Sequence, residues 1–259
     1  MKLDEVQRAS QEQFARQSGH YGRGHVLENV DDLRAALEHL SLRVPARVLD
    51  VATGAGHTGL FFAGLGHQVT LADIAEPMLN RAAQAACERG FRVETRLHAA
   101  EDFPYQSNCF DLVVCRVAAH HFSSPAAFVR ESNRVLRSGG YFLLIDGTVE
   151  DGQPEAEAWA HAVEKLRDPS HHRLLTPDTW RRLCEDTGLR VLHRQITPFK
   201  QPDLNWYFEA AATPPANRRQ VLELVDRAPE PARRLFRLEK QDGKIIWWWQ
   251  RLTLVANKP

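Results

Sequence analysis

The stretch from Val48 to Gly59 reads VLDVATGAGHTG, and it decides the fold. Its first four residues are an apolar, β-branched run around one aspartate, which is typical of a strand buried on both faces. Gly54 and Gly56 then form a tight turn in which any Cβ atom would hold a ligand away from the backbone. An apolar helix follows from about Thr58. This order of strand, glycine turn and helix N-terminus predicts a site for a nucleotide-like ligand.

The glycine pattern alone leaves two ligand classes open. Gly54, Gly56 and Gly59 also satisfy the G-x-G-x-x-G pattern that dinucleotide-dependent dehydrogenases share. Asp50 lies inside the strand, four residues before the first glycine. The next apolar run ends in Asp73, about 17 residues after Gly56, where a ribose diol would need a carboxylate acceptor. These two acids and two later motifs are needed to choose between the classes.

Strand and helix signals alternate from Arg47 to about Pro198. Repeated β–α units predict an α/β fold with a mostly parallel sheet and helices on both of its faces. Strands are expected at 47–53, 68–74, 92–99, 110–117, 139–147 and 189–197, with a last strand at 244–257. Helices are expected between them at 57–66, 76–89, 124–137 and 176–187.

Two segments fall outside this alternation. Helical patterns at 3–18 and 29–41 precede the glycine turn, and others near 203–212 and 216–238 precede the last strand. Neither segment is apolar enough to hold a core of its own. We expect one domain, 1–259, with a core at about 43–198 plus the strand 244–257. Segments 1–42 and 199–243 then form a helical lid over the carboxyl ends of the strands.

The bulk composition excludes several classes of protein. The 259 residues carry a formal net charge of zero and no long basic run, so strong attraction to nucleic acid is not expected. No apolar stretch of about 18 residues exists to span a membrane, and the polar N-terminus lacks the apolar region of a secretory signal. Four scattered cysteines indicate reduced thiols and a cytoplasmic protein.

Several later motifs resemble those of class I methyltransferases that use S-adenosyl-L-methionine (SAM). The run FDLVVC at 110–115 and RVLRSGG at 134–140 resemble the fourth-strand motif and the turn before the fifth strand of that family. Dehydrogenases do not usually carry this pair, which favours SAM over a nicotinamide cofactor. Segments AAHHF at 118–122 and RDPSHHR at 167–173, with Trp180, resemble the ubiquinone/menaquinone-type (UbiE-like) subgroup of bacteria.

The resemblance implies a Rossmann-like, seven-stranded sheet in which the last strand lies antiparallel between the fifth and sixth. It also implies roles at the cofactor. Asp50 accepts hydrogen bonds either from the glycine loop or from the cofactor's amino group, Asp73 binds the ribose, and Ile74 covers the adenine. Met78 packs near it or fills the core. The expected cofactor residues are Asp50, Ala52, Gly54, Gly56, His57, Asp73, Ile74, Met78, Ala100, Glu101, Arg116 and Val117.

One departure from the family concerns the adenine. The segment HAAEDFPY at 98–105 resembles the family's GDAExLPF, in which the second residue is often an acid that holds the adenine amino group. Here that residue is Ala99. The backbone of Ala100 or the side chain of Glu101 is the expected substitute.

Two clusters are candidates for the acceptor side. His120 and His121 follow the fourth strand, and we expect one of them to be structural and the other to face the pocket as a general base. Arg116 either touches a ligand or caps the sheet. The second cluster is the segment RDPSHHR at 167–173, which is either a solvated, capped turn or a site of substrate recognition. Its adjacent histidines point in different directions, so no metal site is expected. The expected substrate residues are Tyr21, Arg167, Asp168, His171, His172 and Arg173.

These expectations combine into one function and one alternative. The function is in-line methyl transfer from SAM to carbon, oxygen or nitrogen of a small-molecule acceptor, with quinone-like and phenolic compounds as the first candidates and S-adenosyl-L-homocysteine (SAH) as product. The alternative is a protein that binds SAM or SAH without methyl transfer. The run Trp247–Trp249 places its first and third rings on one strand face, where core packing is expected. Monomer and homodimer both stay open.

Overall fold

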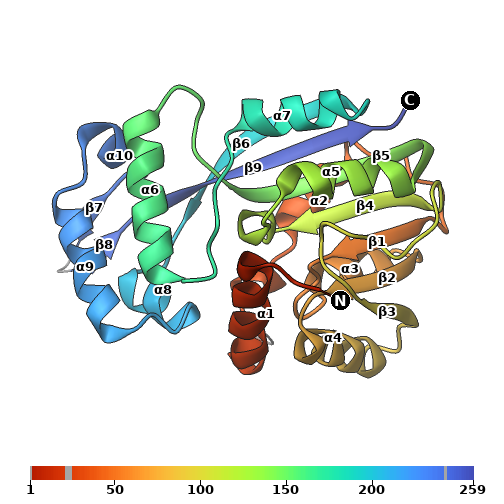
Figure 1. The fold of residues 1–259 in the computed structure, drawn as a ribbon, viewed down its shortest axis with the longest axis horizontal. Coiled ribbons are helices and arrows are strands. Elements are labelled where there is room, and N and C mark those ends of the chain that lie inside the picture. The colour runs from red at the N-terminus through yellow and green to blue at the C-terminus, as the bar shows by residue number, and fades with distance from the viewer. Residues whose placement is uncertain (1, 21–24, 242–243) are drawn as a thin grey trace.

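The computed structural model describes residues 2–20, 25–241 and 244–259. Its main sheet has seven strands in the order β3-β2-β1-β4-β5-β9-β6, with only β9 antiparallel to its neighbours (Figure 1). This confirms the predicted mostly parallel sheet and the placement of its last strand. The strands are β1 (Arg47–Val51), β2 (Gln68–Asp73), β3 (Val93–Leu97), β4 (Phe110–Arg116), β5 (Leu136–Thr148), β6 (Arg190–Lys200) and β9 (Trp248–Asn257).

Helices cover both faces of this sheet, because its central strands are apolar on both sides. One face carries α5 (Pro125–Val135) and α7 (Pro177–Asp186), which bury Phe128 and Trp180. The other face carries the helices α2 (Asp31–Leu37), α3 (His57–Gly64) and α4 (Glu76–Glu88). The carboxyl ends of the parallel strands thereby stay free of both layers, and ligand sites of open α/β sheets lie at such ends.

A second hydrophobic cluster lies beyond the carboxyl end of β5, on the left of Figure 1. It joins α6 (Pro154–Arg167), α8 (Leu204–Ala210), α9 (Pro215–Asp226) and α10 (Glu230–Leu235). Helix α6 was not among the predicted helices. The predicted helix 216–238 is two helices, because prolines at 229 and 231 interrupt it. The predicted strand 244–257 is likewise divided, with a short hairpin of β7 (Glu239–Gln241) and β8 (Lys244–Ile246) before β9.

The N-terminal segment crosses the carboxyl ends of the strands. Helix α1 (Glu5–Gln17) begins with a capping box in which Asp4 accepts from the Gln7 backbone and the Gln7 side chain accepts in return. Gln13 and Gln17 donate to the carbonyl oxygen of Ala211, after α8, so the two predicted lid segments touch each other. Among the described helices none has both the length and the apolar character needed to cross a membrane.

Candidate functional site

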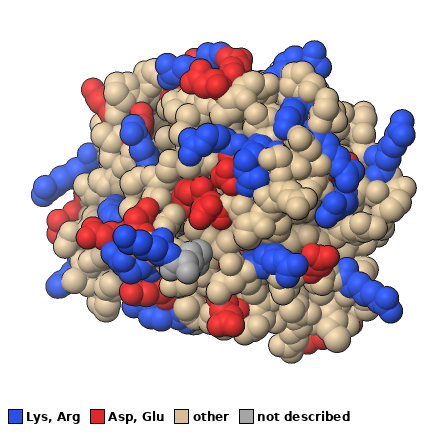
Figure 2. Space-filling model, turned by 45° about the vertical axis from the view of Figure 1, so that its right-hand side comes forward, with Lys and Arg blue, Asp and Glu red and all other residues tan. Residues whose placement is uncertain are grey.

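One continuous cavity lies at the carboxyl ends of the central strands, beneath α1 and beside α6 and α8. Its lining comes from the turn after β1, from the ends of β2, β4 and β5, and from β9. The cavity therefore brings residues from both halves of the chain to one place, and three parts of it can be distinguished. On the outer face shown in Figure 2, Lys and Arg side chains are interspersed with Asp and Glu side chains.

The first part is the glycine turn after β1. Oδ2 of Asp50 accepts from the Thr53 hydroxyl and, at 2.8 Å, from the backbone N–H of Gly59 in α3. Burial raises the pKa of Asp50 to about 7. Asp50 does not line the cavity, so of its two expected roles the structure shows the one toward the loop. It locks the turn to the start of the helix.

The turn itself presents backbone to the cavity. Ala52, Gly54 and Gly56 have φ angles of 55°, 54° and 87°, in the left-handed region that favours glycine. Asp73 accepts from the backbone N–H groups of Gly54 and Ala75, both at 2.9 Å. Burial raises the pKa of Asp73 to about 6. Asp73 also lines the cavity, as its expected role at a ribose requires.

The adenine side of this part holds Ile74, Met78, Ala100 and Glu101, which all line the cavity. The Glu101 carboxylate already has protein partners, because Oε2 accepts from the Gln7 amide and Oε1 from the Ser123 backbone, both at 2.8 Å. It ties α1 to the turn before α5. Two groups were expected to replace the missing acid at Ala99. Because the Glu101 side chain is bonded to the protein, the Ala100 backbone is the substitute that remains for an adenine.

Arg116, at the end of β4, holds the N-terminal segment. All three of its guanidinium nitrogens donate: Nε and Nη2 to Asp32, each at 2.9 Å, and Nη1 and Nη2 to the carbonyl oxygens of Leu27 and Asn29. Its side chain is 2% exposed. Arg116 and the adjacent Val117 line the cavity. Because all three guanidinium nitrogens of Arg116 already have partners, we interpret Arg116 as a residue that positions the N-terminal segment.

His57 opens α3 directly after the glycine turn and also lines the cavity. Its ring stacks on that of His25, with centroids 6.2 Å apart, and its Nε2 is buried without a hydrogen-bond partner among the described residues. Burial lowers the pKa of His57 to about 4, with a further contribution from the nearby Arg116 charge. A neutral, unpartnered imidazole nitrogen at a helix N-terminus is available to a polar ligand group.

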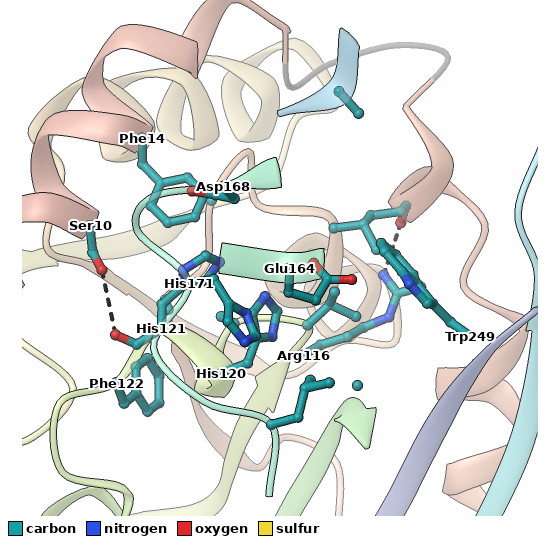
Figure 3. Close-up of a pocket in the computed structure, with 18 of the residues that line it drawn as sticks. Ser10, Phe14, Arg116, His120, His121, Phe122, Glu164, Asp168, His171 and Trp249 are labelled. Atoms are coloured by element: carbon teal, nitrogen blue, oxygen red, sulfur yellow. Dashed lines mark hydrogen bonds between the residues drawn. The ribbon is translucent and has the colours of Figure 1, made fainter. Parts of the chain in front are cut away.

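The second part of the cavity is built around His120, which Figure 3 shows beside His121 and His171. His120 Nδ1 lies 2.7 Å from Oδ1 of Asp146, which is near the end of β5. Burial alone would lower the pKa of His120, but the charge and hydrogen bond of Asp146 raise it above the ordinary value. Asp146 is 1% exposed, whereas the His120 side chain keeps 14% of its surface toward the cavity.

Asp146 was not predicted, although the sequence carries a signal for it. It interrupts the apolar run FLLIDG near the carboxyl end of a central strand, next to the strand that precedes His120. Such a buried carboxylate needs a partner. No described residue bonds to Nε2 of His120, so this nitrogen is the one directed at the cavity.

His121 belongs to a separate network. Its Nδ1 lies 3.1 Å from the Ser170 hydroxyl, which itself donates to Asp168 at 2.6 Å. Burial and the neighbouring His120 charge lower the pKa of His121 to about 4. The edge of its ring packs against Phe14 of α1, and its carbonyl oxygen accepts from Ser10. His121 also lines the cavity, but these contacts join α1 to the segment after α6, which indicates a structural role.

The histidine-rich segment after α6 is divided between cavity and solvent. His171 is buried and lines the cavity, and burial lowers its pKa strongly. The side chains of His172 and Arg173 are exposed and lie outside the cavity; only their backbone N–H groups approach it, as donors to the His120 carbonyl. Within the residues that the structure describes, no three His, Cys, Asp or Glu side chains are grouped so that they could hold a metal ion. Tyr21, the remaining expected substrate residue, lies outside the described residues.

The third part of the cavity is a chamber of aromatic side chains, which we call the aromatic chamber: Trp159, Tyr207, Phe236, Trp247 and Trp249. The ring centroids of Trp247 and Trp249 lie 4.6 and 5.5 Å from that of Tyr207. Trp247 lies in the break between β8 and β9, so strand alternation does not place it, but both tryptophans meet the cavity as well as the second hydrophobic cluster.

Two charged residues of α6 complete the aromatic chamber. Glu164 accepts from the Tyr207 hydroxyl at 2.7 Å and from Arg167 at 3.2 Å. The guanidinium of Arg167 lies over the Tyr207 ring, 4.3 Å from its centroid, and also over Trp249. Arg167 and Asp168 line the cavity as expected. Glu164 and its partner Tyr207 were missed because α6, which carries Glu164, was not predicted.

Comparisons with known proteins find similarity to methyltransferases. Residues 49–144 match the family described as methyltransferase domain. The protein named Uncharacterized methyltransferase YcgJ of Bacillus subtilis (strain 168) is 28% identical over 247 residues, 94% of this chain and 96% of that protein. Its crystal structure matches with a TM-score of 0.84 at 27% identity, over 89% of this chain and 99% of that one.

Two further relatives extend the match. The crystal structure of a proposed methyltransferase from Bacillus halodurans C-125 is 28% identical, with a TM-score of 0.82 over 88% of this chain and 99% of that chain. The ubiquinone biosynthesis O-methyltransferase of Xanthomonas axonopodis pv. citri is 36% identical over 112 residues, which cover 42% of this chain and 47% of that enzyme.

Proposed function

Because the chain carries a methyltransferase domain on the class I methyltransferase fold, we propose that it transfers a methyl group from SAM to a small-molecule acceptor, with His120 as general base. The observation that carries this proposal is the pair His120–Asp146. It lies at the ends of the adjacent strands β4 and β5, in the same cavity as the glycine turn.

The residues of the first part suit SAM. Asp73 offers a buried carboxylate for a ribose diol, and Ile74 and Met78 offer apolar surface for an adenine. Gly54 has open space where its Cβ atom would lie, and the unpartnered Nε2 of His57 is available to the polar methionine end. When bound, SAM supplies an activated methyl group together with its leaving group.

The protein then contributes alignment and proton transfer. Holding an acceptor atom in line with the methyl group supplies on the order of 7–11 kcal/mol. Asp146 accepts from Nδ1–H of His120, which leaves Nε2 unprotonated and able to remove a proton from the acceptor. Asp146 opposes the effect of burial and raises the pKa of His120 above its ordinary value, which strengthens the imidazole as a base.

The aromatic chamber supports an acceptor with an apolar body, such as a phenol or quinol. Its rings come from α6, α8, the end of α10 and the start of β9, and the chamber is continuous with the His120 part of the cavity. One relative is by name an O-methyltransferase of ubiquinone biosynthesis. The corresponding reaction here would be methylation of an acidic O–H or C–H whose proton passes to His120. The cytoplasmic location and the absence of a nucleic-acid acceptor remain predictions.

The test combines calorimetry with a labelled-methyl screen over phenols, quinols and amines. We expect micromolar binding of SAM and SAH and none of NAD(H), and at least one methylated acceptor. His120→Ala should lower kcat about 10²–10⁴-fold and leave SAH affinity unchanged. His39→Ala, at an exposed histidine outside the cavity, should change neither. Unchanged kcat in His120→Ala would refute the base, and SAH binding without any methylated acceptor would favour the binding-protein alternative.

A further inference from the structure

Arg251 on β9 is a largely buried cation whose hydrogen-bonding capacity is mostly unused. It lines the cavity, and its side chain is 12% exposed. Its single side-chain hydrogen bond to the described residues runs from Nη1 to Oδ2 of Asp32, at 3.2 Å. The Phe199 ring supports its guanidinium at 4.2 Å from the ring centroid. A planar cation held in place by a ring and one carboxylate still has N–H groups to offer.

The neighbouring charges do not satisfy Arg251. Asp32 is shared, because Arg116 already takes both of its oxygens in a two-point contact. Asp146 is the other nearby carboxylate, and its Oδ1 is occupied by His120. Arg116, by contrast, spends all three nitrogens on the N-terminal segment. Arg116 and Arg251 are both largely buried and share the carboxylate of Asp32. An additional anion is therefore favoured at Arg251, which has fewer hydrogen bonds.

The position of Arg251 in the sheet places that anion on the acceptor side. Arg251 pairs with Gly147 of β5, the residue directly after Asp146, whereas the glycine turn follows β1, which is separated from β9 by β4 and β5. In Figure 3, Arg116 and Trp249 lie across the cavity from Ser10 and Phe14, with His120 between them. An anion at Arg251 would therefore lie next to the proton acceptor and at the edge of the aromatic chamber.

We propose that Arg251 binds a carboxylate of the acceptor, so that the acceptor is an organic acid with an apolar, ring-sized body. This inference rests on the proposed function and specifies its substrate class. The carboxylate accepts from Arg251, the apolar body fills the aromatic chamber, and the atom to be methylated faces Nε2 of His120. A carboxylate could instead belong to the methionine end of the cofactor, and the experiment separates these two sources.

The first arm uses two probes of one shape, 2-naphthoate and 2-naphthamide, titrated into protein saturated with SAH while tryptophan fluorescence is recorded. A charged hydrogen bond to Arg251 predicts that the naphthoate binds about tenfold or more tightly than the amide. Arg251→Gln should abolish this preference, and Arg251→Lys should keep part of it. Arg190→Gln, on the exposed side of β6, should keep all of it. Equal binding of the two probes by the wild type, or an intact preference in Arg251→Gln, would overturn the proposal.

The second arm compares SAH with 5′-methylthioadenosine, which lacks the amino-acid end. If Arg251 serves the acceptor, Arg251→Gln leaves the affinity for both nucleosides unchanged. A selective loss of SAH affinity would assign Arg251 to the cofactor's carboxylate and overturn the acceptor assignment. Failure of the wild type to bind SAH would refute the proposed function itself, and the naphthoate preference can still be measured without SAH, so the two failures are distinguishable.

Discussion

The cavity has a cofactor half, formed by the glycine turn and its surroundings, and an acceptor half, formed by the His120 part and the aromatic chamber. The two halves are built in different ways. On the cofactor side, the decisive contacts join a side chain to nearby backbone, as when Asp50 accepts from Gly59 and Asp73 accepts from Gly54. On the acceptor side, they join side chains far apart in the chain, such as Glu164 with Tyr207 and Arg251 with Asp32. We expect the side built from backbone contacts to bind the cofactor and the side-chain pairs to select the acceptor. Substitutions in the acceptor half should therefore alter turnover and selectivity while cofactor affinity stays constant.

The largest expected effect concerns Asp146 on the acceptor side. Asp146→Asn should lower kcat by about 10² or more, because His120 loses the charge that keeps it a competent base. Burial would then lower the His120 pKa without opposition. Since the base acts unprotonated, the acid limb of the kcat–pH profile should move to lower pH. Kinetics across pH 5–9, with calorimetry of SAH, would measure both.

The same substitution has a consequence for stability with a defined sign. His120 has a raised pKa in the folded state, so its pair with Asp146 stabilises the fold fully below the unfolded pKa of about 6.5. That contribution is lost as pH rises through the folded pKa. The stability difference between wild type and Asp146→Asn should thus be largest in acid. The exposed Asp186→Asn is the control, and a pH-independent difference would argue against a charged pair.

The next effect tests the cofactor side, where the backbone carries the site. A Cβ atom on Gly59 would lie 2.1 Å from Leu71 Cδ2 and 3.0 Å from Asp50 Oδ2. Leu71 is fully buried, so Gly59→Ala should cost about 1–3 kcal/mol in unfolding free energy and weaken SAH binding as α3 moves. Gly64→Ala in the same helix meets only ordinary contact with Phe91 and should be neutral or slightly stabilising. Urea unfolding compares them, and equal stabilities would refute this packing.

The same contrast explains what could be predicted from sequence. The alternation of strands and helices and the glycine turn follow from local periodicity and spacing, whereas the antiparallel placement of the last strand came from the family resemblance. The sheet and its relatives confirm this fold. Asp146 was missed because a strand acid gains meaning only from its partner on the neighbouring strand. The sequence located the pair His120 and His121 but could not assign a different role to each. Only tertiary contacts distinguish them, because His120 is bonded to Asp146 and His121 to Ser170.

The segment after α6 shows a second limit. Six of the seven residues in RDPSHHR are polar or charged, and pattern alone could not say which of them face inward. The structure buries Asp168 and His171 and exposes His172 and Arg173, because the chain turns there around the His120 carbonyl. Arg116 is similar: its place at a strand end suggested a ligand, and contacts from the N-terminal segment occupy it instead.

The smallest expected effect lies where the two halves meet over the cavity. Gln13 and Gln17 of α1 donate to the Ala211 carbonyl at 3.2 and 2.6 Å, and both are buried. A hydrogen bond of this kind contributes about 0.5–1.5 kcal/mol net, so replacing Gln17 alone by Ala should raise the SAH dissociation rate about two- to tenfold. Stopped-flow displacement of SAH would measure it, with Gln84→Ala on the exposed face of α4 as the control. An unchanged dissociation rate would mean that α1 does not retain the cofactor, and retention would then depend on the glycine turn alone.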